Sequence, residues 1–221
     1  MDGNNRYGKK HSLPAGQGHS LGSDRLEPVL TWCRDHAIEV LSVFAFSSEN
    51  WQRSAQEVNF LMDLFKTSMI QRLPDMIKNG IKVIFTGDRT RLSESVMRVV
   101  DQVESDTASG KRLILNVAFS YGGRWDITQA ARKLCEQVSS GKLEIEAIDE
   151  GHFESALSTA GLPAVDLLIR TGGEFRISNF LLWQAAYAEL YFTDRLWPDF
   201  GHEDLDQALN FFNQRVRRYG R

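Results

Sequence analysis

The chain has 221 residues, of which 42% are hydrophobic and 25% charged, with 13 Phe and 5 Trp. Such a composition is typical of a compact globular protein and excludes a disordered one. The formal net charge of -3 lacks the basic excess of nucleic-acid-binding domains. Two cysteines without a CxxC pair exclude a disulfide framework. We therefore expect one globular domain over residues 1–221 that does not bind nucleic acid.

The location of the protein is predicted from two segments. The N-terminal stretch is polar and does not have the apolar core of a signal peptide. The longest apolar stretch, residues 40–46, is too short to cross a bilayer. We expect a cytoplasmic protein.

Hydrophobic periodicity predicts helices and strands in alternation. A helix is expected around residues 26–33, a strand over 38–46, and a helix from the Ser54 capping box to Asn79-Gly80. A strand over 81–86, a helix around 96–103, a strand over 113–119 and a helix over 127–138 follow. A strand over 165–169 and a helix over 203–217 complete the pattern. This order favours a single-domain α/β fold with a mostly parallel sheet flanked by helices.

Arginines follow the predicted strands, and Gly-Gly pairs accompany some of them. They are Arg53, Arg89, Arg124, Arg170 and Arg176. Because the carboxyl ends of parallel strands meet at one edge of a sheet, we expect these side chains along one rim. Guanidinium groups match phosphate oxygens in pairs of hydrogen bonds, so the pattern favours a phosphorylated ligand over solvated loop arginines.

The first residues of the sequence combine a carboxylate, a glycine and an arginine in Asp2, Gly3 and Arg6. A lone aspartate is usually a surface or turn residue. However, Mg²⁺ in proteins typically binds one or two carboxylates together with phosphate oxygens of the substrate. Beside diphosphate-binding arginines, Asp2 becomes a candidate magnesium ligand.

Residues 18–22 (GHSLG) match the GxSxG motif of serine hydrolases, with Ser20 as the nucleophile. That motif requires a strand directly before it, and the sequence of residues 9–17 does not predict one. The same segment approximates a dinucleotide fingerprint, again without a preceding strand. A serine hydrolase is therefore the weaker of the two enzymatic hypotheses.

Several motifs occur together and in order. They are MDGN at 1–4, GH at 18–19, FSSENW at 46–51 with Arg53, YGGR at 121–124, and RTGGEFRISNF at 170–180. Together they resemble the cis-prenyltransferase family, and most of all its bacterial undecaprenyl diphosphate synthase branch. Residues 183–198 and RYG at 218–220 also look like that family. The resemblance spans essentially the whole chain.

The resemblance implies a transferase that condenses isopentenyl diphosphate successively onto farnesyl diphosphate with cis geometry. The implied product is undecaprenyl diphosphate, a lipid carrier precursor for cell-wall polysaccharide and peptidoglycan synthesis. It further implies Mg²⁺ as cofactor, a homodimer, a transient contact with a membrane surface for product release, and a hydrophobic elongation tunnel beside the helix over 54–79. Some relatives of this fold act as non-catalytic partner subunits, and these are expected to lack the aspartate or the arginines that this sequence retains.

Carried over position by position, the resemblance implies that Asp2 binds Mg²⁺ and helps the allylic diphosphate leave. Asn50 is implied as a catalytic proton acceptor, and Glu189 as a second residue at the metal. The residues implied to bind substrate are Gly3, Asn4, Asn5, Arg6, Tyr7, His19, Ser47, Ser48, Glu49, Trp51, Arg53, Arg170, Arg176, Ile177 and Ser178. Arg218 and Gly220 resemble an element that reaches the active site of the partner subunit.

The sequence departs from the family pattern at several places, among them Ser54 in place of a frequent proline. The family normally has a strand that ends in the aspartate motif, and here Asp2 is the second residue, so this strand is expected to be absent from the sequence. Ala15 stands where an arginine is frequent, which removes one diphosphate contact. Phe175 replaces a histidine that contributes to metal binding in relatives. Tyr7 replaces a common tryptophan and keeps an aromatic ring.

Overall fold

The computed structural model describes residues 1–215. These residues group into two compact units. The first unit comprises Met1–Ile38, Val165–Ile177 and the chain from Ala185 onward. The second unit comprises Glu39–Ala164 and Ser178–Gln184. The assignment of residues 1–221 to a single catalytic domain stays a prediction.

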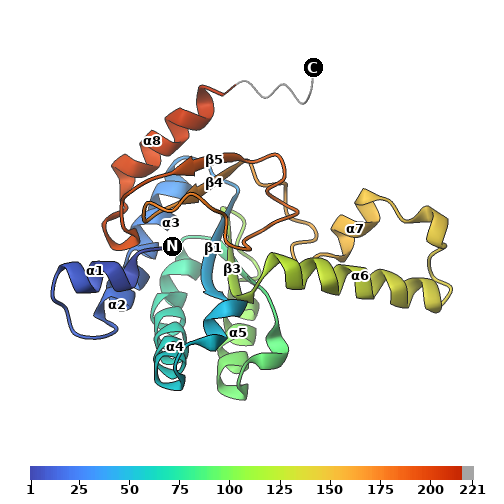
Figure 1. Ribbon diagram of the computed structural model, residues 1–221, viewed down its shortest axis with the longest axis horizontal. Coiled ribbons are helices and arrows are strands. Elements are labelled where there is room, and N and C mark those ends of the chain that lie inside the picture. Colours follow the sequence, from blue (N-terminus) through green and yellow to red (C-terminus); the bar gives the residue numbers. More distant parts are fainter. Residues whose placement is uncertain (216–221) are drawn as a thin grey trace. The chain divides into compact units, whose positions relative to one another are not determined.

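A three-stranded parallel sheet forms the centre of the second unit (Figure 1). Its strands, in spatial order, are β1 (Val40–Ser47), β3 (Leu113–Tyr121) and β2 (Ile81–Thr86). The central strand β3 is buried at every position except Ile114. Its near-continuous apolar sequence is typical of a parallel strand covered on both faces. The three strands predicted for this part of the chain are confirmed.

Helices α4 (Ala55–Lys78) and α5 (Glu94–Thr107) pack against this sheet and against each other (Figure 1). The predicted N-cap is present, since the Ser54 hydroxyl accepts the backbone N–H of Glu57 at 3.2 Å. Phe65 of α4 stacks on Phe119 of β3 with ring centroids 4.0 Å apart. Phe65 therefore belongs to the core between helix and sheet. In residues 1–215 no helix, α4 included, is both long enough and apolar enough to cross a membrane.

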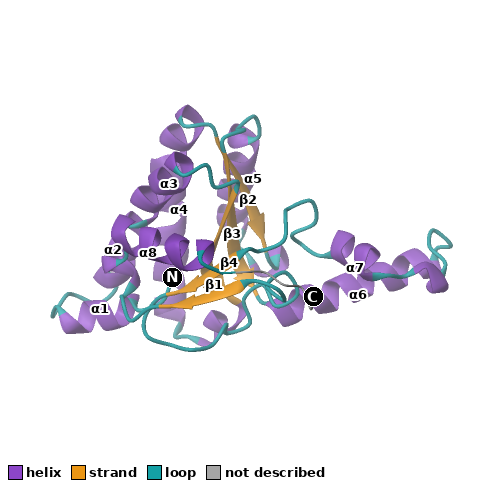
Figure 2. Cartoon of the chain, turned by 90° about the horizontal axis from the view of Figure 1, so that it is seen from above, coloured by secondary structure: helices purple, strands orange, loops and turns teal. Residues whose placement is uncertain are grey.

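Helix α6 (Gly123–Ser139) and helix α7 (Glu150–Ala156) lie side by side and extend away from the three-stranded sheet (Figure 2). Ala130 and Leu134 of α6 form a small buried cluster with Ala156 and Leu157. Trp183 packs against this cluster. The helix pair thus has its own small core.

A buried ladder of polar side chains crosses the three strands of the second unit. The Thr86 hydroxyl donates to Asn116 Oδ1 at 3.0 Å, and Asn116 Nδ2 donates to the Ser42 hydroxyl at 3.1 Å. Asn116 has no exposed surface. Because each buried amide atom has a partner, the ladder avoids the cost of unpaired polar groups.

The first unit contains a second sheet with two parallel strands, β4 (Leu167–Arg170) and β5 (Glu189–Phe192). Its helices are α1 (Asn4–Lys10), α2 (Gln17–Asp24), α3 (Leu26–Asp35) and α8 (His202–Asn213). In the described residues β4 pairs with β5 in a sheet separate from the three-stranded one, a division that the alternating pattern did not predict. The predicted last helix ends earlier than expected, at Asn213.

Candidate active site

Asp2 lies in a charged cluster of the first unit, at the C-terminal end of β4. Asp2 Oδ2 accepts a hydrogen bond from Arg170 Nη2 at 3.0 Å, and Oδ1 accepts the Gly3 backbone N–H at 2.7 Å. Arg6 Nη2 is 3.7 Å from Oδ1. The Asp2 backbone is also held, because its N–H donates to the Thr171 hydroxyl at 2.9 Å and its carbonyl accepts from that hydroxyl at 3.0 Å. Backbone and side chain are therefore both fixed.

The charge state of Asp2 follows from these contacts. Burial raises the pKa of its carboxyl group. The hydrogen bonds from Arg170 and Gly3, with the charges of Arg170 and Arg6, outweigh burial and hold the pKa below its ordinary value. The side chain remains 40% exposed. Asp2 is thus an ionised carboxylate with room for a further ligand.

The loop after β4 brings two more charged side chains to this cluster. Glu174 Oε1 lies 3.6 Å from Arg6 Nη1, and Arg176 Nη1 donates to Glu174 Oε2 at 2.5 Å. Arg170 Nη1 donates to the backbone carbonyl of Arg176. Arg6, Arg170 and Arg176 therefore lie in one cluster, and its binding of a phosphorylated ligand stays a prediction. Glu174 was not predicted, although it stands between the Gly-Gly pair and Arg176.

Glycine is required at the start of this loop. Gly172 and Gly173 have φ angles of +89° and +70°, which side chains rarely tolerate. A Cβ atom on Gly172 would also lie 2.5 Å from Arg6 Nη2. The glycines let the loop turn back beside the arginine.

The donor set around Asp2 suits Mg²⁺ only in part. In the chain as described up to residue 215, no three His, Cys, Asp or Glu side chains are grouped so as to hold a metal ion. Glu189, the other predicted ligand, lies 3.8 Å from Arg215 Nε. Phe175 supplies no ligand atom, and its 78%-exposed ring packs against Phe192. The residues fit a magnesium ion that is held by Asp2 together with phosphate oxygens, since Mg²⁺ commonly binds in this way.

The second unit carries the predicted reaction-centre residues on the 3-10 helix η1 (Ser48–Gln52). Asn50 Oδ1 accepts the Ser47 backbone N–H at 3.1 Å, which completes a capping box. Trp51 Nε1 donates to the Ser120 hydroxyl at 3.0 Å, and the Trp51 ring meets Phe46 edge-on at 5.0 Å. These contacts hold Asn50 and Trp51 at the end of β1.

The five arginines expected along one rim belong to both units, so a common rim stays a prediction. Arg53, Arg89 and Arg124 follow strands of the three-stranded sheet, whereas Arg170 and Arg176 follow β4 of the other sheet. Two of the first three are also engaged by carboxylates of their own unit. The contacts are Arg53 Nη1 to Glu57 Oε1 at 2.8 Å and Arg89 Nη2 to Glu104 Oε1 at 2.7 Å.

Arg91, which the sequence analysis did not identify, lies beside η1. The Arg91 guanidinium is 4.8 Å from the centre of the Trp51 ring, a cation–π contact. Its only sequence signal was its position in the segment after β2.

The Gly122-Gly123 pair serves packing. A Cβ on Gly122 would lie 2.4 Å from the Ser48 hydroxyl, and one on Gly123 would lie 2.6 Å from Leu182 Cγ. These positions therefore admit the neighbouring chain segments.

The helix pair α1–α2 accounts for the GxSxG segment. A Cβ on Gly18 would lie 2.1 Å from the Asn4 carbonyl oxygen, and one on Gly22 would lie 2.2 Å from Asn4 Oδ1. Both glycines therefore allow α2 to approach α1. Ser20 lies inside α2, which follows a turn and no strand, so the strand-turn-helix geometry of a hydrolase nucleophile is absent from these residues.

The other predicted substrate residues are distributed over both units. On α1, Asn5 is exposed and Tyr7 packs against His11 with ring centroids 4.3 Å apart. On α2, His19 is partly buried. Ile177 is partly buried and Ser178 is exposed, and these two residues belong to different units. Arg218 and Gly220 lie outside the described residues.

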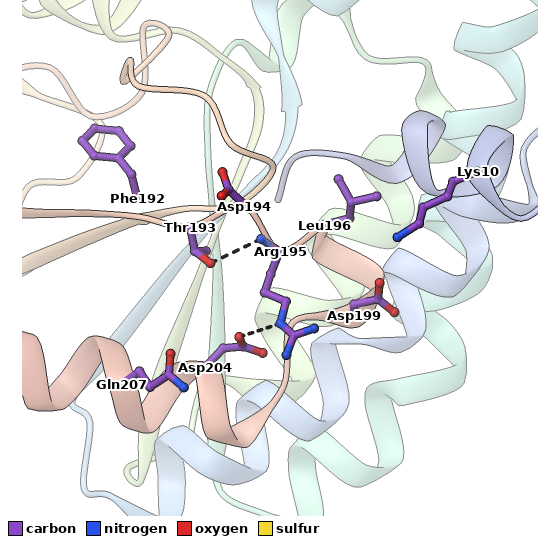
Figure 3. A pocket seen from close by; sticks show the side chains of 9 residues that line it. All are labelled: Lys10, Phe192, Thr193, Asp194, Arg195, Leu196, Asp199, Asp204 and Gln207. Atoms are coloured by element: carbon purple, nitrogen blue, oxygen red, sulfur yellow. Dashed lines mark hydrogen bonds and ion pairs between the residues drawn. The ribbon is translucent and has the colours of Figure 1, made fainter.

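A pocket of about 540 Å³ also lies in the first unit (Figure 3). Its lining includes Lys10, Arg195, Asp199 and Asp204, and Arg195 Nε is 3.2 Å from Asp204 Oδ1. None of the residues predicted to bind substrate lines this pocket. The main predicted site residues lie elsewhere, around Asp2 in the first unit and on η1 in the second.

Comparison with known proteins decides the family. The family model described as "Putative undecaprenyl diphosphate synthase" matches residues 1–220. The chain belongs to this family of cis-prenyltransferases. A ditrans,polycis-undecaprenyl-diphosphate synthase of Acinetobacter baylyi is 49% identical over 221 residues, which cover 100% of this chain and 89% of the relative. One from Pseudomonas aeruginosa is 48% identical over 221 residues, with 100% and 88% covered.

A solved structure of a related enzyme supports the fold of this chain. Lavandulyl diphosphate synthase from Lavandula x intermedia, crystallised with dimethylallyl diphosphate, superposes with a TM-score of 0.96 at 34% identity. The match covers 100% of this chain and 95% of the lavender chain. The predicted α/β fold with a parallel sheet flanked by helices is confirmed.

Proposed function

We propose that this cis-prenyltransferase condenses isopentenyl diphosphate successively onto farnesyl diphosphate to give undecaprenyl diphosphate. The bacterial relatives are named as ditrans,polycis-undecaprenyl-diphosphate synthases specific for (2E,6E)-farnesyl diphosphate. The observation that carries the proposal is the cluster of Asp2 with Arg6, Arg170 and Arg176. It combines an ionised carboxylate with three guanidinium groups, the set that a diphosphate and its metal need.

In the reaction, the C–O bond between the allylic carbon and its diphosphate breaks, and a new C–C bond forms to isopentenyl diphosphate. A proton then leaves the isopentenyl unit. The negative charge that develops on the departing diphosphate is the main electrostatic demand on the site. Arg6, already beside Asp2, would bind these oxygens, and Gly3, Asn4 and His19 would contribute contacts from α1 and α2.

Members of this family typically use Mg²⁺, and Asp2 would hold it with the substrate phosphates. Bound there, the ion would neutralise charge on the leaving diphosphate. Glu189 is proposed to assist from the start of β5. Arg170, Arg176, Ile177 and Ser178 are proposed to bind isopentenyl diphosphate.

The η1 residues are proposed to surround the reacting carbons. Trp51 offers an aromatic face, which attracts positive charge of the kind that develops on an allylic carbon. Asn50 is proposed to act on the departing proton. Because a neutral amide is a weak base, its contribution would be to orient the isopentenyl unit and to pass the proton on. Ser47, Ser48, Glu49 and Arg53 complete this part of the site.

Partners and the product path are part of the proposal. The chain is proposed to form a homodimer and to touch a membrane surface transiently when the apolar product leaves. The elongation tunnel is proposed along α4, where Leu61 and Met62 are only partly buried. The side chains of a filled core would be expected to be fully buried, which supports a product path there.

The deciding experiment is incubation of the protein with farnesyl diphosphate, radiolabelled isopentenyl diphosphate and Mg²⁺. We expect label in a lipid that chromatographs as undecaprenol after dephosphorylation, and no product when EDTA is added. Absence of product in the presence of Mg²⁺ would contradict the proposal and favour a non-catalytic partner subunit.

A further inference from the structure

The segment Ser178–Gln184 of the second unit has an unusual backbone. Ser178, Asn179 and Leu181 have φ angles of 47°, 65° and 46°. Residues other than glycine seldom adopt this left-handed region, although asparagine tolerates it best. Such conformations are energetically unfavourable and persist only where neighbouring contacts impose them.

The contacts that impose this conformation centre on Asn179. Its Oδ1 accepts the backbone N–H of Arg124 at 2.8 Å, and its carbonyl oxygen accepts the N–H of Gly123 at 2.7 Å. Both donors lie in the first turn of α6, where backbone N–H groups have no partner within the helix. The Asn179 Nδ2 group donates to Glu49 Oε1 at 2.7 Å. One side chain thus joins the start of α6 to η1.

The surroundings are built around this arrangement. A Cβ on Gly122 would lie 2.7 Å from Asn179 Nδ2, so only glycine leaves room for the amide. The next residue, Phe180, stacks on Phe44 of β1 with ring centroids 4.6 Å apart. Burial raises the pKa of Glu49, but hydrogen bonds, that from Asn179 first among them, hold it below its ordinary value. Glu49 is therefore an ionised acceptor for the amide.

We propose that Asn179 is a positioning residue that holds η1, with Asn50 and Trp51, in a fixed relation to Ser178. The proposal rests on the function proposed above for these residues. Asn179 is joined to Ser178 by a peptide bond, and its amide reaches Glu49, the residue before Asn50. A shift of this side chain would therefore move the proposed isopentenyl-binding residue Ser178 relative to Asn50.

The test exchanges the two partners of the Asn179–Glu49 hydrogen bond. Asn179→Asp keeps an acceptor for the Arg124 N–H but sets a second carboxylate against Glu49. We expect kcat/KM for isopentenyl diphosphate to fall about ten-fold or more at a temperature where the variant is fully folded. Adding Glu49→Gln restores a donor on the other side, and we expect kcat/KM of the double variant to rise clearly above that of Asn179→Asp, as coupling between the two side chains requires.

Gln184→Glu is the matched control. Gln184 lies in the same segment, and its Nε2 donates to Asp126 Oδ2 at 3.1 Å and to the Thr159 hydroxyl at 2.8 Å. The substitution places a second carboxylate beside that of Asp126, but away from η1. We expect a lower melting temperature with KM for isopentenyl diphosphate unchanged. An equal loss of kcat/KM in this control, or no recovery in the double variant, would overturn the proposal.

Hydrogen exchange of residues 47–53 gives a readout that does not depend on turnover. We expect exchange in this segment to accelerate in Asn179→Asp and to return to the parent rate in the double variant. Unchanged exchange in Asn179→Asp would overturn the positioning role. Failure of the parent protein to make polyprenyl product would instead contradict the proposed function, so the two failures can be told apart.

Discussion

Asp2 gives the most direct test of the proposed metal site, because its carboxylate lies beside both Arg6 and Arg170. We expect Asp2→Asn to lower kcat by at least about 10²–10³-fold. Arg6, Arg170 and Arg176 remain, so KM for both diphosphates should change little. Steady-state kinetics with saturating Mg²⁺ measures both constants, and near-normal turnover would show that Asp2 has another role.

The lowered pKa of Asp2 also predicts how stability depends on pH. A carboxyl group whose pKa is lower in the folded state contributes stability above its unfolded-state pKa, near the ordinary value of 3.8. That contribution is lost as the pH falls from there through the lower folded-state pKa. We expect the parent to lose stability relative to Asp2→Asn on acidification below about pH 3.8.

Urea unfolding of both proteins between about pH 3 and pH 6 measures this difference. A stability difference that stayed constant across this range would mean that the contacts of Asp2 with Arg170 and Gly3 do not lower its pKa.

Ser20 separates the two enzymatic hypotheses. It lies inside α2 between Gly18 and Gly22, and both glycines pack closely against Asn4. We expect Ser20→Ala to keep prenyl transfer within about two-fold of the parent, because this partly buried hydroxyl is not among the residues proposed to bind substrate. The parent should not react with a fluorophosphonate probe. Stoichiometric labelling of Ser20 would contradict this reading.

At the scale of the element, α4 contains an internal proline whose cost can be measured. Pro74 is exposed, lies near the C-terminal end of the helix, and has no N–H to donate to the preceding turn. We expect Pro74→Ala to stabilise the protein by up to about 3 kcal/mol, since proline is disfavoured by this amount in helix interiors. Chemical denaturation measures the change.

Pro163→Ala is the matched control, because Pro163 is exposed and lies outside helices and strands. There the substitution only adds freedom to the unfolded chain, and we expect a loss of about 0.4–1 kcal/mol or less. If both variants shifted stability in the same direction, the helical position of Pro74 would not be the cause.

Which elements the sequence predicted depended on their length and periodicity. The strands of the second unit and α4 carry long apolar patterns with clear end signals at Ser54 and Gly80, and all were predicted. Strand β5 has four residues, of which Leu190 is exposed, so it has neither the length nor the alternation that identifies a strand. It exists through its pairing with β4, which is a tertiary contact. The short, polar helix α1 escaped prediction for a related reason.

At the scale of the whole molecule, binding provides a prediction. A ligand that binds only the folded state stabilises it by about 2.7 kcal/mol when its concentration is 100 times its Kd. We expect farnesyl diphosphate with Mg²⁺ to raise the melting temperature of the parent by several degrees. Arg170→Ala should reduce this shift, because that side chain is the most buried partner of Asp2 and is only 13% exposed.

Inorganic diphosphate with Mg²⁺ is the comparison ligand, since it offers the charge without the prenyl chain. An equal shift with both ligands would show that the chain does not contribute to binding. An unchanged shift in Arg170→Ala would place the diphosphate elsewhere.

The residues of the candidate site were predicted in part from chemistry and in part from resemblance. Arginines after strands predicted an anion site, and Arg170 lies beside Asp2 while its guanidinium also donates to the Arg176 backbone carbonyl. The same reasoning included Arg89 in the anion site, although its guanidinium is engaged by Glu104. The sequence does not reveal this contact, because Glu104 lies fifteen residues further along the chain. Glu174 and Asn179 were not predicted as site residues. Their importance arises from partners that are distant in sequence or from backbone angles that no local pattern announces.

The polar ladder of Ser42, Asn116 and Thr86 has a consequence for how the three-stranded sheet assembles. Strand β3 is buried on both faces, so hydrophobic alternation cannot align it with its neighbours. A slip by one residue would move Asn116 from its place opposite Ser42 and Ile84 and separate the amide from both hydroxyls. Each buried polar group left without a hydrogen-bond partner would cost about 1–3 kcal/mol of folding free energy. A single amide therefore favours one register of the three strands. A sheet in another register would leave buried polar groups unpaired and would be too unstable to persist during folding.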